Sequence, residues 1–306
     1  MAVALYTHRD MLNHTPPGRH AERSARLAAV SEALAAESGL DLEPREAPLA
    51  LREDLLRVHD ESYLAAIEAA APSIGVVQLD PDTFMSAGSL TAARRAAGGA
   101  MAAARAIAAG EIQRAFCAVR PPGHHAGPGF AMGFCIFSSI ALAARAAQSA
   151  GLARVAIADF DVHHGNGTQA VFEADPSVLF ASVHQSPLYP GTGDPSETGA
   201  GNIVNAIVAP DAPREAWRRA FEGLVDRIDA FDPDLLLISA GFDAHARDPL
   251  ANQRLEAEDF AWATRALVSV AERRCAGRIV SSLEGGYDLE GLAASATAHV
   301  KALEGR

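Results

Sequence analysis

Short apolar runs and longer amphipathic stretches alternate along this chain of 306 residues. The apolar runs are rich in β-branched and aliphatic side chains and are bounded by glycine, proline, aspartate or histidine, which is typical of buried strands. The predicted strands lie at residues 2–6, 115–119, 154–158, 178–183, 235–239 and 278–283. The predicted helices lie at residues 21–37, 89–109, 137–148, 213–231 and 257–274. This alternation predicts an α/β fold, a mostly parallel central sheet with crossover helices on both faces.

The chain contains no repeat and no linker rich in proline, glycine or serine. The residues with candidate chemistry are spread from His124 to Tyr287, so distant segments are expected to build one site. We therefore expect residues 1–306 to form a single catalytic domain.

Composition narrows the function classes. The chain is 49% apolar and 21% charged, which is ordinary for a globular protein. Its net charge of −12 argues against direct nucleic-acid binding, because phosphate neutralisation needs clustered lysine and arginine. No apolar run reaches the ~18 residues of a membrane span, and the start lacks a secretory signal pattern. Three cysteines in apolar contexts suit a reducing compartment, so we expect a cytoplasmic protein without membrane partners.

Four polar motifs follow predicted strands directly. They are P-P-G-H-H-A-G, D-F-D-V-H-H-G-N-G, S-A-G-F-D-A-H and L-E-G-G-Y-D. In open α/β sheets the ligand crevice lies outside the carboxyl ends of the strands. The four motifs are therefore expected to meet in one site.

The second motif has the pattern of a metal site. Residues two apart in an extended segment point the same way, so Asp161 and His163 can face one ion, with Asp159 behind them. The alternative is that the two aspartates cap a helix that starts near Gly167. Asp243 favours the metal, because a carboxylate leaving a buried strand needs a charge partner. Two carboxylates and one imidazole with an open fourth position are typical of a catalytic zinc site.

The first and last motifs supply candidate acid-base and electrophilic groups. His124 and His125 sit on a stiff Pro-Pro-Gly turn, and histidine titrates nearest neutral pH. Asp159 and Asn166 are natural partners for their second ring nitrogens. Two glycines before Tyr287 let that loop fold so that the phenol can stabilise an oxyanion.

Together the four motifs, in this order, resemble the histone deacetylase / acetylpolyamine amidohydrolase family, which has an arginase-like α/β fold. The resemblance runs from about residue 20 to residue 289 and is closer to class II, since Asn166 stands where class I has Asp. It implies a zinc-dependent amidohydrolase that removes acetyl or other acyl groups from lysine side chains or similar amines. By the same resemblance, the zinc ligands are Asp161, His163 and Asp243, the tandem acid-base pair is His124 and His125 with Asp159 and Asn166 behind them, and Tyr287 polarises the scissile carbonyl.

The resemblance also assigns a substrate channel. Phe134 and Tyr189 match its aromatic walls, although the family more often has Phe at the second position. Gly133 corresponds to a backbone carbonyl that holds the substrate amide. Leu250 stands where dedicated eukaryotic polyamine deacetylases keep a gatekeeper Glu.

Structural potassium ions are a further implication of the resemblance. One ion would lie against Asp159, Asp161, His163, Ser182 and Val183, and a second would lie near Phe172, Asp175 and Val178. At the amino-terminal end the chain reads G-R-H-A-E-R where the family has H-P-E-x-P-E-R, so the resemblance assigns no role to His20 or Glu22.

Three alternative functions remain open. A binuclear manganese ureohydrolase of the same fold needs D-x-H-x-D, but Gly165 stands in place of the last carboxylate. A non-catalytic acyl-amine binding protein could dispense with Tyr287 or a metal ligand, and none is missing. An acetylpolyamine amidohydrolase would share every catalytic residue. The same ligands would also accept Fe(II) or Co(II).

Overall fold

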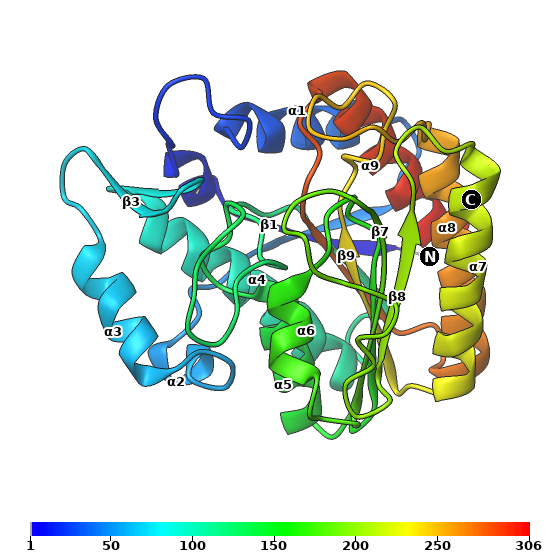
Figure 1. Cartoon of the computed structure of the whole chain (residues 1–306). Helices are drawn as coiled ribbons and strands as arrows, with labels where there is room; N and C mark the ends of the chain where they lie inside the picture. The colour runs from blue at the N-terminus through cyan, green and yellow to red at the C-terminus, as the bar shows by residue number, and fades with distance from the viewer. Residues whose placement is uncertain (1) are drawn as a thin grey trace.

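The structure is a computed structural model that describes residues 2–306 and is built on one eight-stranded sheet. The strand order is β2-β1-β5-β10-β9-β6-β7-β8, and every neighbouring pair is parallel (Figure 1). The strands are β1 (Val3–Thr7), β2 (Leu42–Glu46), β5 (Arg114–Cys117), β6 (Val155–Asp159), β7 (Val178–Gln185), β8 (Ile203–Val208), β9 (Leu235–Ala240) and β10 (Ile279–Leu283). The predicted α/β fold with a parallel central sheet is confirmed.

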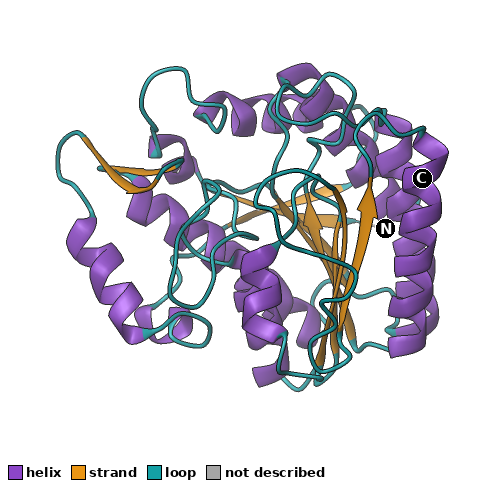
Figure 2. Ribbon diagram, in the orientation of Figure 1, coloured by secondary structure: helices purple, strands orange, loops and turns teal. Residues whose placement is uncertain are grey.

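Helices cover both faces of this sheet (Figure 2). On one face α4 and α5 pack together, α4 against β1, β5 and β10 and α5 against β6 and β9. On the other face α7 packs against β6, β7 and β8, α8 against β9, and α9 against β1 and β5. The helices are α1 (Ser24–Ala36), α2 (Arg52–Leu55), α3 (Glu61–Ala70), α4 (Ser89–Ala108), α5 (Ser139–Ser149), α6 (Asn166–Phe172), α7 (Arg214–Phe231), α8 (Ala257–Arg274) and α9 (Leu289–Glu304), with a short 3₁₀ helix at Arg9–Asn13. None of the helices within residues 2–306 has the length and apolar character needed to cross a bilayer.

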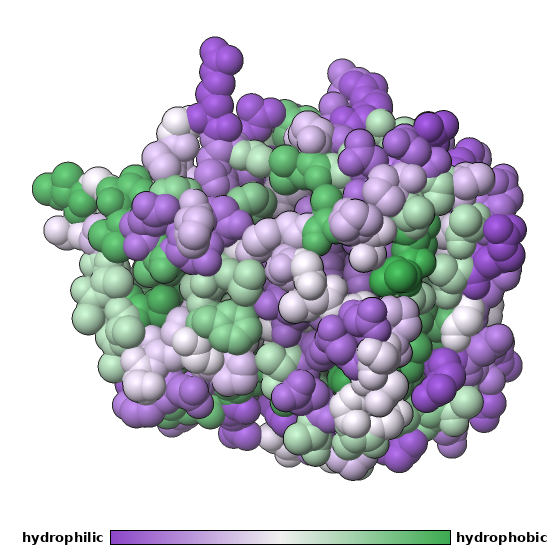
Figure 3. Space-filling view, viewed as in Figure 1, coloured by the Kyte–Doolittle hydropathy of each residue, from purple (hydrophilic) through white to green (hydrophobic). Residues whose placement is uncertain are grey.

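A small antiparallel hairpin stands apart from the main sheet. Its strands are β3 (Val76–Asp80) and β4 (Thr83–Ser86), and it lies beyond the amino-terminal end of α4 (Figure 1). Hydrophobic surface gathers at the left edge of the molecule, over the loop that enters β3 (Figure 3). Ile74 of this loop is 90% exposed.

The sequence pattern missed both edge strands, the two hairpin strands, and the helices α2, α3, α6 and α9. β2 reads L-E-P-R-E and β8 reads I-V-N-A-I-V; each lies at an edge of the sheet with a partner strand on only one side, and each leaves part of its side chains exposed. A proline is tolerated in β2 for the same reason. The helix α9 has a signal that could have found it, because Asp288 caps its first turn by accepting a hydrogen bond from the N–H of Gly291.

The central strands are buried on both faces, which explains their nearly continuous apolar runs. Phe160 follows β6 and stands between two aspartates in the sequence. Its side chain is buried in the core on the side of the sheet that α7, α8 and α9 cover. Its ring centroid lies 6.0 Å from those of Phe242 and Phe260 and 6.4 Å from that of Phe221. The aromatic cluster therefore fixes the backbone that carries Asp159 and Asp161.

We expect Phe160→Ala to lower the free energy of unfolding by about 3–5 kcal/mol, because it removes a fully buried ring from a packed cluster. Urea denaturation measures the change. The matched control is Ile74→Ala, where the side chain is 90% exposed and the expected change is within about 0.5 kcal/mol. Equal effects of the two substitutions would contradict this account of the core.

Candidate active site

Two neighbouring strands bring the three predicted metal ligands together. Asp161 and His163 follow β6, Asp243 follows β9, and β6 and β9 are paired in the sheet. All three side chains are buried, and their ligand atoms lie within 4.8 Å of one another. Nδ1 of His163 lies 3.1 Å from Oδ1 of Asp161 and 3.1 Å from Oδ2 of Asp243.

Backbone N–H groups hold the two carboxylates in this orientation. The N–H of His163 donates to Oδ1 of Asp161 at 3.0 Å, and the N–H of Gly285 donates to Oδ2 at 2.7 Å. The N–H of Val162 donates to Oδ1 of Asp243 at 2.9 Å, which leaves Oδ2 facing His163. Donors that bind one zinc at about 2.0–2.2 Å in a tetrahedral shell lie roughly 3.3 Å apart. This is close to the 3.1 Å that separates Nδ1 of His163 from each carboxylate oxygen. The donor set therefore fits a single divalent ion.

Two glycines allow the carboxylates to approach the backbone so closely. A β-carbon at Gly241 would collide with Asp161. A β-carbon at Gly285 would collide with Asp243 and would lie 2.6 Å from Oδ2 of Asp161. The glycines of S-A-G-F-D and L-E-G-G-Y-D are thus required by steric contact with the ligand set.

The electrostatics of these three residues favour a bound cation. Burial would raise the pKa of Asp161, but the positive charges of His124 and His163 hold it below the usual range. Burial and then the charge of Asp161 raise the pKa of Asp243 to about 7. Burial opposes protonation of His163, yet the two carboxylates raise its pKa to about 10. The two carboxylates therefore hold a proton on His163, and a metal ion that binds at this point would replace that proton.

The tandem histidines lie beside the ligand set with different partners. Nδ1 of His124 lies 3.0 Å from Oδ2 of Asp159, and Nδ1 of His125 lies 2.7 Å from Oδ1 of Asn166. The two ring centroids are 4.0 Å apart. The carboxylate of Glu284 fixes their loop, since it accepts hydrogen bonds from the N–H groups of Gly123 at 2.6 Å and His124 at 3.1 Å.

The two imidazoles consequently differ in charge. Burial opposes the charged form of His124, but Asp161 and Asp159 outweigh it and raise the pKa to about 10. The pKa of His125 falls well below its ordinary value because of burial and the positive charges of His124 and His163. These shifts favour the cationic form of His124 and the neutral form of His125.

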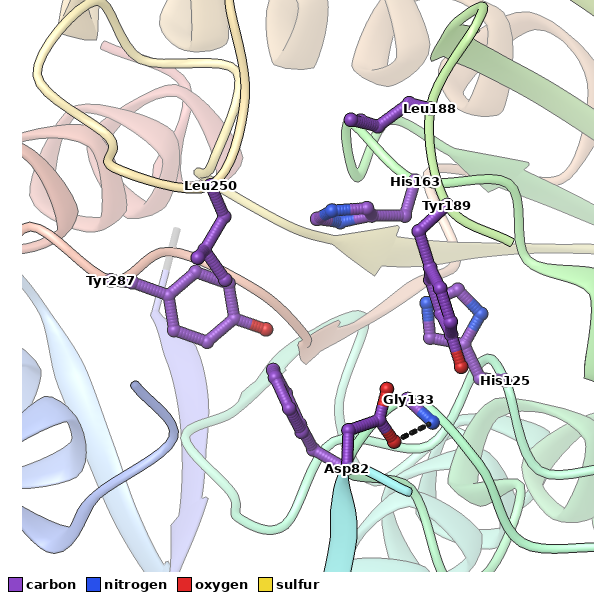
Figure 4. A pocket seen from close by; sticks show the side chains of 9 residues that line it. Asp82, His125, Gly133, His163, Leu188, Tyr189, Leu250 and Tyr287 are labelled. Atoms are coloured by element: carbon purple, nitrogen blue, oxygen red, sulfur yellow. Dashed lines mark hydrogen bonds between the residues drawn. The ribbon is translucent and has the colours of Figure 1, made fainter. Parts of the chain in front are cut away.

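A cavity of about 190 Å³ leads to these groups (Figure 4). The predicted channel residues are among its lining, and the hydroxyl of Tyr287 points into the space that His163 and His125 border (Figure 4). The rings of Phe134 and Tyr287 meet edge to face with centroids 5.7 Å apart. The lining residues are Asp82, His125, Gly133, Phe134, His163, Leu188, Tyr189, Leu250 and Tyr287.

Asp82 is a channel residue that the sequence analysis missed. It lies on the turn between β3 and β4, and its Oδ1 accepts hydrogen bonds from the N–H of Gly133 at 2.9 Å and from the hydroxyl of Thr83 at 2.9 Å. Burial and then the charge of Asp82 raise the pKa of Tyr189, which keeps that phenol protonated. In the sequence, this residue belongs only to a short acidic turn. Its contact with the site could not be predicted, because its partner lies 51 residues further along the chain.

The amino-terminal segment supports the loop that carries Tyr287. Glu22 is fully buried and accepts two hydrogen bonds from Arg120, at 2.8 and 2.7 Å. It also pairs with Arg26 at 3.4 Å. Arg26 in turn donates to the carbonyl oxygens of Gly286 and Glu284, and its guanidinium lies 4.8 Å from the ring centroid of Tyr287.

His20 instead packs against two residues of the channel lining, Asp82 and Phe134. Its Nε2 lies 3.2 Å from the carbonyl oxygen of Asp82, and its ring packs edge to face on Phe134 with centroids 4.8 Å apart. His20 and Glu22 thus belong to one short segment but contact different parts of the site.

The residues assigned to structural cations fall in two places. Asp159 is paired in register with Ser182 across β6 and β7, directly behind the ligand set. The carbonyl oxygens of Phe172, Asp175 and Val178 converge beyond the end of α6, where each accepts a hydrogen bond from the side chain of Asn202.

Comparison with known proteins agrees with this geometry. A sequence model of the histone deacetylase domain matches residues 20–303. A "Probable deacetylase" of Archaeoglobus fulgidus is 39% identical over 302 residues, which is 95% of this chain and 83% of that protein. A "Histone deacetylase-like amidohydrolase" of Pseudomonas aeruginosa is 42% identical over 253 residues, 80% of this chain and 66% of that protein.

A solved structure agrees as well. The crystal structure of the HDA15 HD domain superposes with a TM-score of 0.94 at 36% sequence identity, and the match covers 100% of this chain and 88% of that one. Fold, domain match and relatives all lead to the same conclusion, that this chain belongs to the histone deacetylase family.

Proposed function

We propose that this chain is a zinc-dependent amidohydrolase that removes acetyl or other acyl groups from lysine side chains or similar acylated amines. The observation that carries the proposal is the convergence of Asp161, His163 and Asp243 beside a neutral His125 at a channel lined by Tyr287. The relatives described above, a probable deacetylase and a histone deacetylase-like amidohydrolase, support the same chemistry.

The metal would be held by Asp161, His163 and Asp243. When bound, it would polarise the scissile carbonyl and lower the pKa of a water towards neutrality. Zinc is our proposal from the family resemblance, and the same ligands accept Fe(II) or Co(II). We also propose one structural potassium ion against Asp159, Asp161, His163, Ser182 and Val183.

His125 is the proposed general base and acid. Its Nδ1 carries the hydrogen, because Oδ1 of Asn166 accepts it while Nδ2 of Asn166 donates to the sulfur of Met132. Nε2 therefore has a free lone pair, and it takes the proton of the attacking water as the oxygen adds to the carbonyl carbon. The proton then passes to the amine nitrogen as the carbon–nitrogen bond breaks, which yields acetate and a free amine.

Other residues stabilise charge and orient the substrate. Tyr287 stays protonated because burial raises its pKa, so its hydroxyl can donate to the developing oxyanion. The cationic ring of His124 adds electrostatic stabilisation of the negative charge that develops on the substrate. The aromatic side chains of Phe134 and Tyr189 would flank the aliphatic tether of the substrate, and the carbonyl of Gly133 would accept from its amide N–H.

An acetylpolyamine is the second candidate substrate. It would use every group named above, and the carboxylate of Asp82 on the channel lining would attract its amine groups. Against dedicated polyamine recognition, Leu250 contributes an apolar side chain to the same lining. A binuclear manganese centre is disfavoured, because the ligand cluster found within residues 2–306 has three members and Gly165 offers no further carboxylate.

A hydrolysis panel tests the function. It compares an acetyl-lysine peptide, an acetylated polyamine and a longer acyl-lysine peptide, each with and without a chelator. We expect acetyl-lysine hydrolysis that the chelator abolishes and zinc restores.

The variant Tyr287→Phe should lower turnover by about 10²–10³ with unchanged metal content, since one oxyanion donor is lost. Hydrolysis that persists in the chelator, or full turnover by the variant, would refute the mechanism.

Metal analysis tests the ligand set. We expect one divalent ion per chain and its loss in Asp243→Ala, because two ligands do not replace three. The control is Asp234→Ala at the opposite end of β9, where the carboxylate accepts from the N–H of Arg154 and should leave metal content unchanged. Two ions per chain in the wild type would instead indicate a binuclear centre.

The pH profile tests the role of His125. In Asn166→Asp a carboxylate would face Nδ1 and favour the protonated ring, so the pKa of His125 should rise by about one unit or more. Because the neutral ring is the active form, the acidic limb of the kcat/KM profile should move to higher pH. Metal content and Tm serve as controls for an intact site. An acidic limb that stays in place would exclude His125 as the base.

A further inference from the structure

Three backbone carbonyls near the end of α6 converge on one side-chain nitrogen. Nδ2 of Asn202 lies 2.7 Å from the carbonyl oxygen of Phe172, 3.0 Å from that of Asp175 and 2.8 Å from that of Val178. Asn202 is 3% exposed. The amide nitrogen thus occupies the centre of an oxygen cluster that is closed to solvent.

The orientation of this amide is fixed by its other contacts. Oδ1 of Asn202 accepts a hydrogen bond from the N–H of Ala200 at 3.0 Å. The backbone carbonyl of Asn202 accepts from the N–H of Phe180 at 2.9 Å, which ties the residue to β7. A flipped amide would set oxygen against three carbonyl oxygens and against no donor, so the nitrogen faces the cluster.

Electrostatics explain why a cation is not needed there. Converging carbonyls present the negative ends of their dipoles, and such rings of oxygens bind monovalent cations in other proteins. The amide group of Asn202 supplies two N–H donors at the same point. Arg145 pairs with the side chain of Asp175, with its Nη1 2.6 Å from Oδ2, so that carboxylate is already neutralised and does not call for a cation. A potassium ion would have to displace the amide of Asn202 from the three carbonyl oxygens.

We infer that Asn202 takes the place of the second structural cation that the family resemblance assigns to Phe172, Asp175 and Val178, so the chain binds no ion at these carbonyls. The first cation site differs in its chemistry. It contains the carboxylate of Asp159, which supplies a negative charge, and the hydroxyl of Ser182, which lies 2.9 Å from Nδ1 of His184. One structural potassium ion, not two, is expected per chain.

The side chain of Asn202 thus links three elements without an ion. Asn202 precedes β8, whereas the carbonyls belong to the end of α6 and the turn into β7. The first residue of α6 is Asn166, whose side chain contacts His125. The position of α6 behind the catalytic base is therefore independent of potassium at its carboxyl end.

The isosteric variant Asn202→Asp tests the inference. It sets a carboxylate oxygen against the carbonyl cluster, an arrangement that needs a cation or a proton between them, so the test is made at a pH well above the ordinary pKa of aspartate. In tetramethylammonium chloride we expect Tm to fall by roughly 5 °C or more relative to the wild type. Potassium chloride at the same ionic strength should recover most of this loss. The gain in Tm from potassium should be clearly larger for the variant than for the wild type, whose gain arises from the first site.

The matched control is Asn205→Asp on β8, where Nδ2 donates to Oε1 of Gln169 instead of to a carbonyl cluster. Its gain from potassium should equal that of the wild type. If Asn202→Asp gains no more from potassium than the wild type does, the inference is wrong.

A measurement on the wild-type, metal-loaded protein is independent of the variant's folding. Crystals grown with thallium(I) in place of potassium reveal monovalent sites by anomalous scattering. We expect no anomalous peak among the carbonyl oxygens of Phe172, Asp175 and Val178. A peak at that point, with the amide of Asn202 turned away, would overturn the inference.

Discussion

Two carboxylates and an imidazole that share one buried point are the constraint on which this structure depends. Taking Asp161 and Asp243 out of water is costly unless a cation and directed hydrogen bonds compensate them. The parallel sheet provides both, because β6 and β9 end side by side and the loops beyond them turn N–H groups toward the carboxylates. The glycines at 241 and 285 are the steric condition for that arrangement.

The same constraint separates the tandem histidines. His124 lies next to two carboxylates that favour its cationic form, whereas burial and the positive charge of His124 favour the neutral form of His125. One short rigid loop therefore presents a fixed positive charge and a free base about 4.0 Å apart. Burial alone would make both rings neutral, so the difference depends on the carboxylates of Asp161 and Asp159 beside His124.

Buried polar networks around the site hold its loops in place. Glu22 aligns Arg120 and Arg26, and Arg26 contacts both the backbone and the ring of the Tyr287 loop. Asn202 satisfies three carbonyls at the end of α6. In each case one buried side chain satisfies several groups that would otherwise be unpaired, and the catalytic residue it supports belongs to another segment.

The sequence alone determined the central strands, the parallel α/β class and the polar motifs at the strand ends. Those features are local, since a continuous apolar run is buried on both faces and Asp161 and His163 share a side by virtue of spacing. Tertiary structure decided the edge strands, the approach of Asp82 to the channel, and the roles of Glu22 and Asn202. Gly133 lies 51 residues from Asp82, Arg120 lies 98 residues from Glu22, and the carbonyl partners of Asn202 lie up to 30 residues away. No pattern of neighbouring residues encodes such contacts, because they depend on which loops the sheet order brings together.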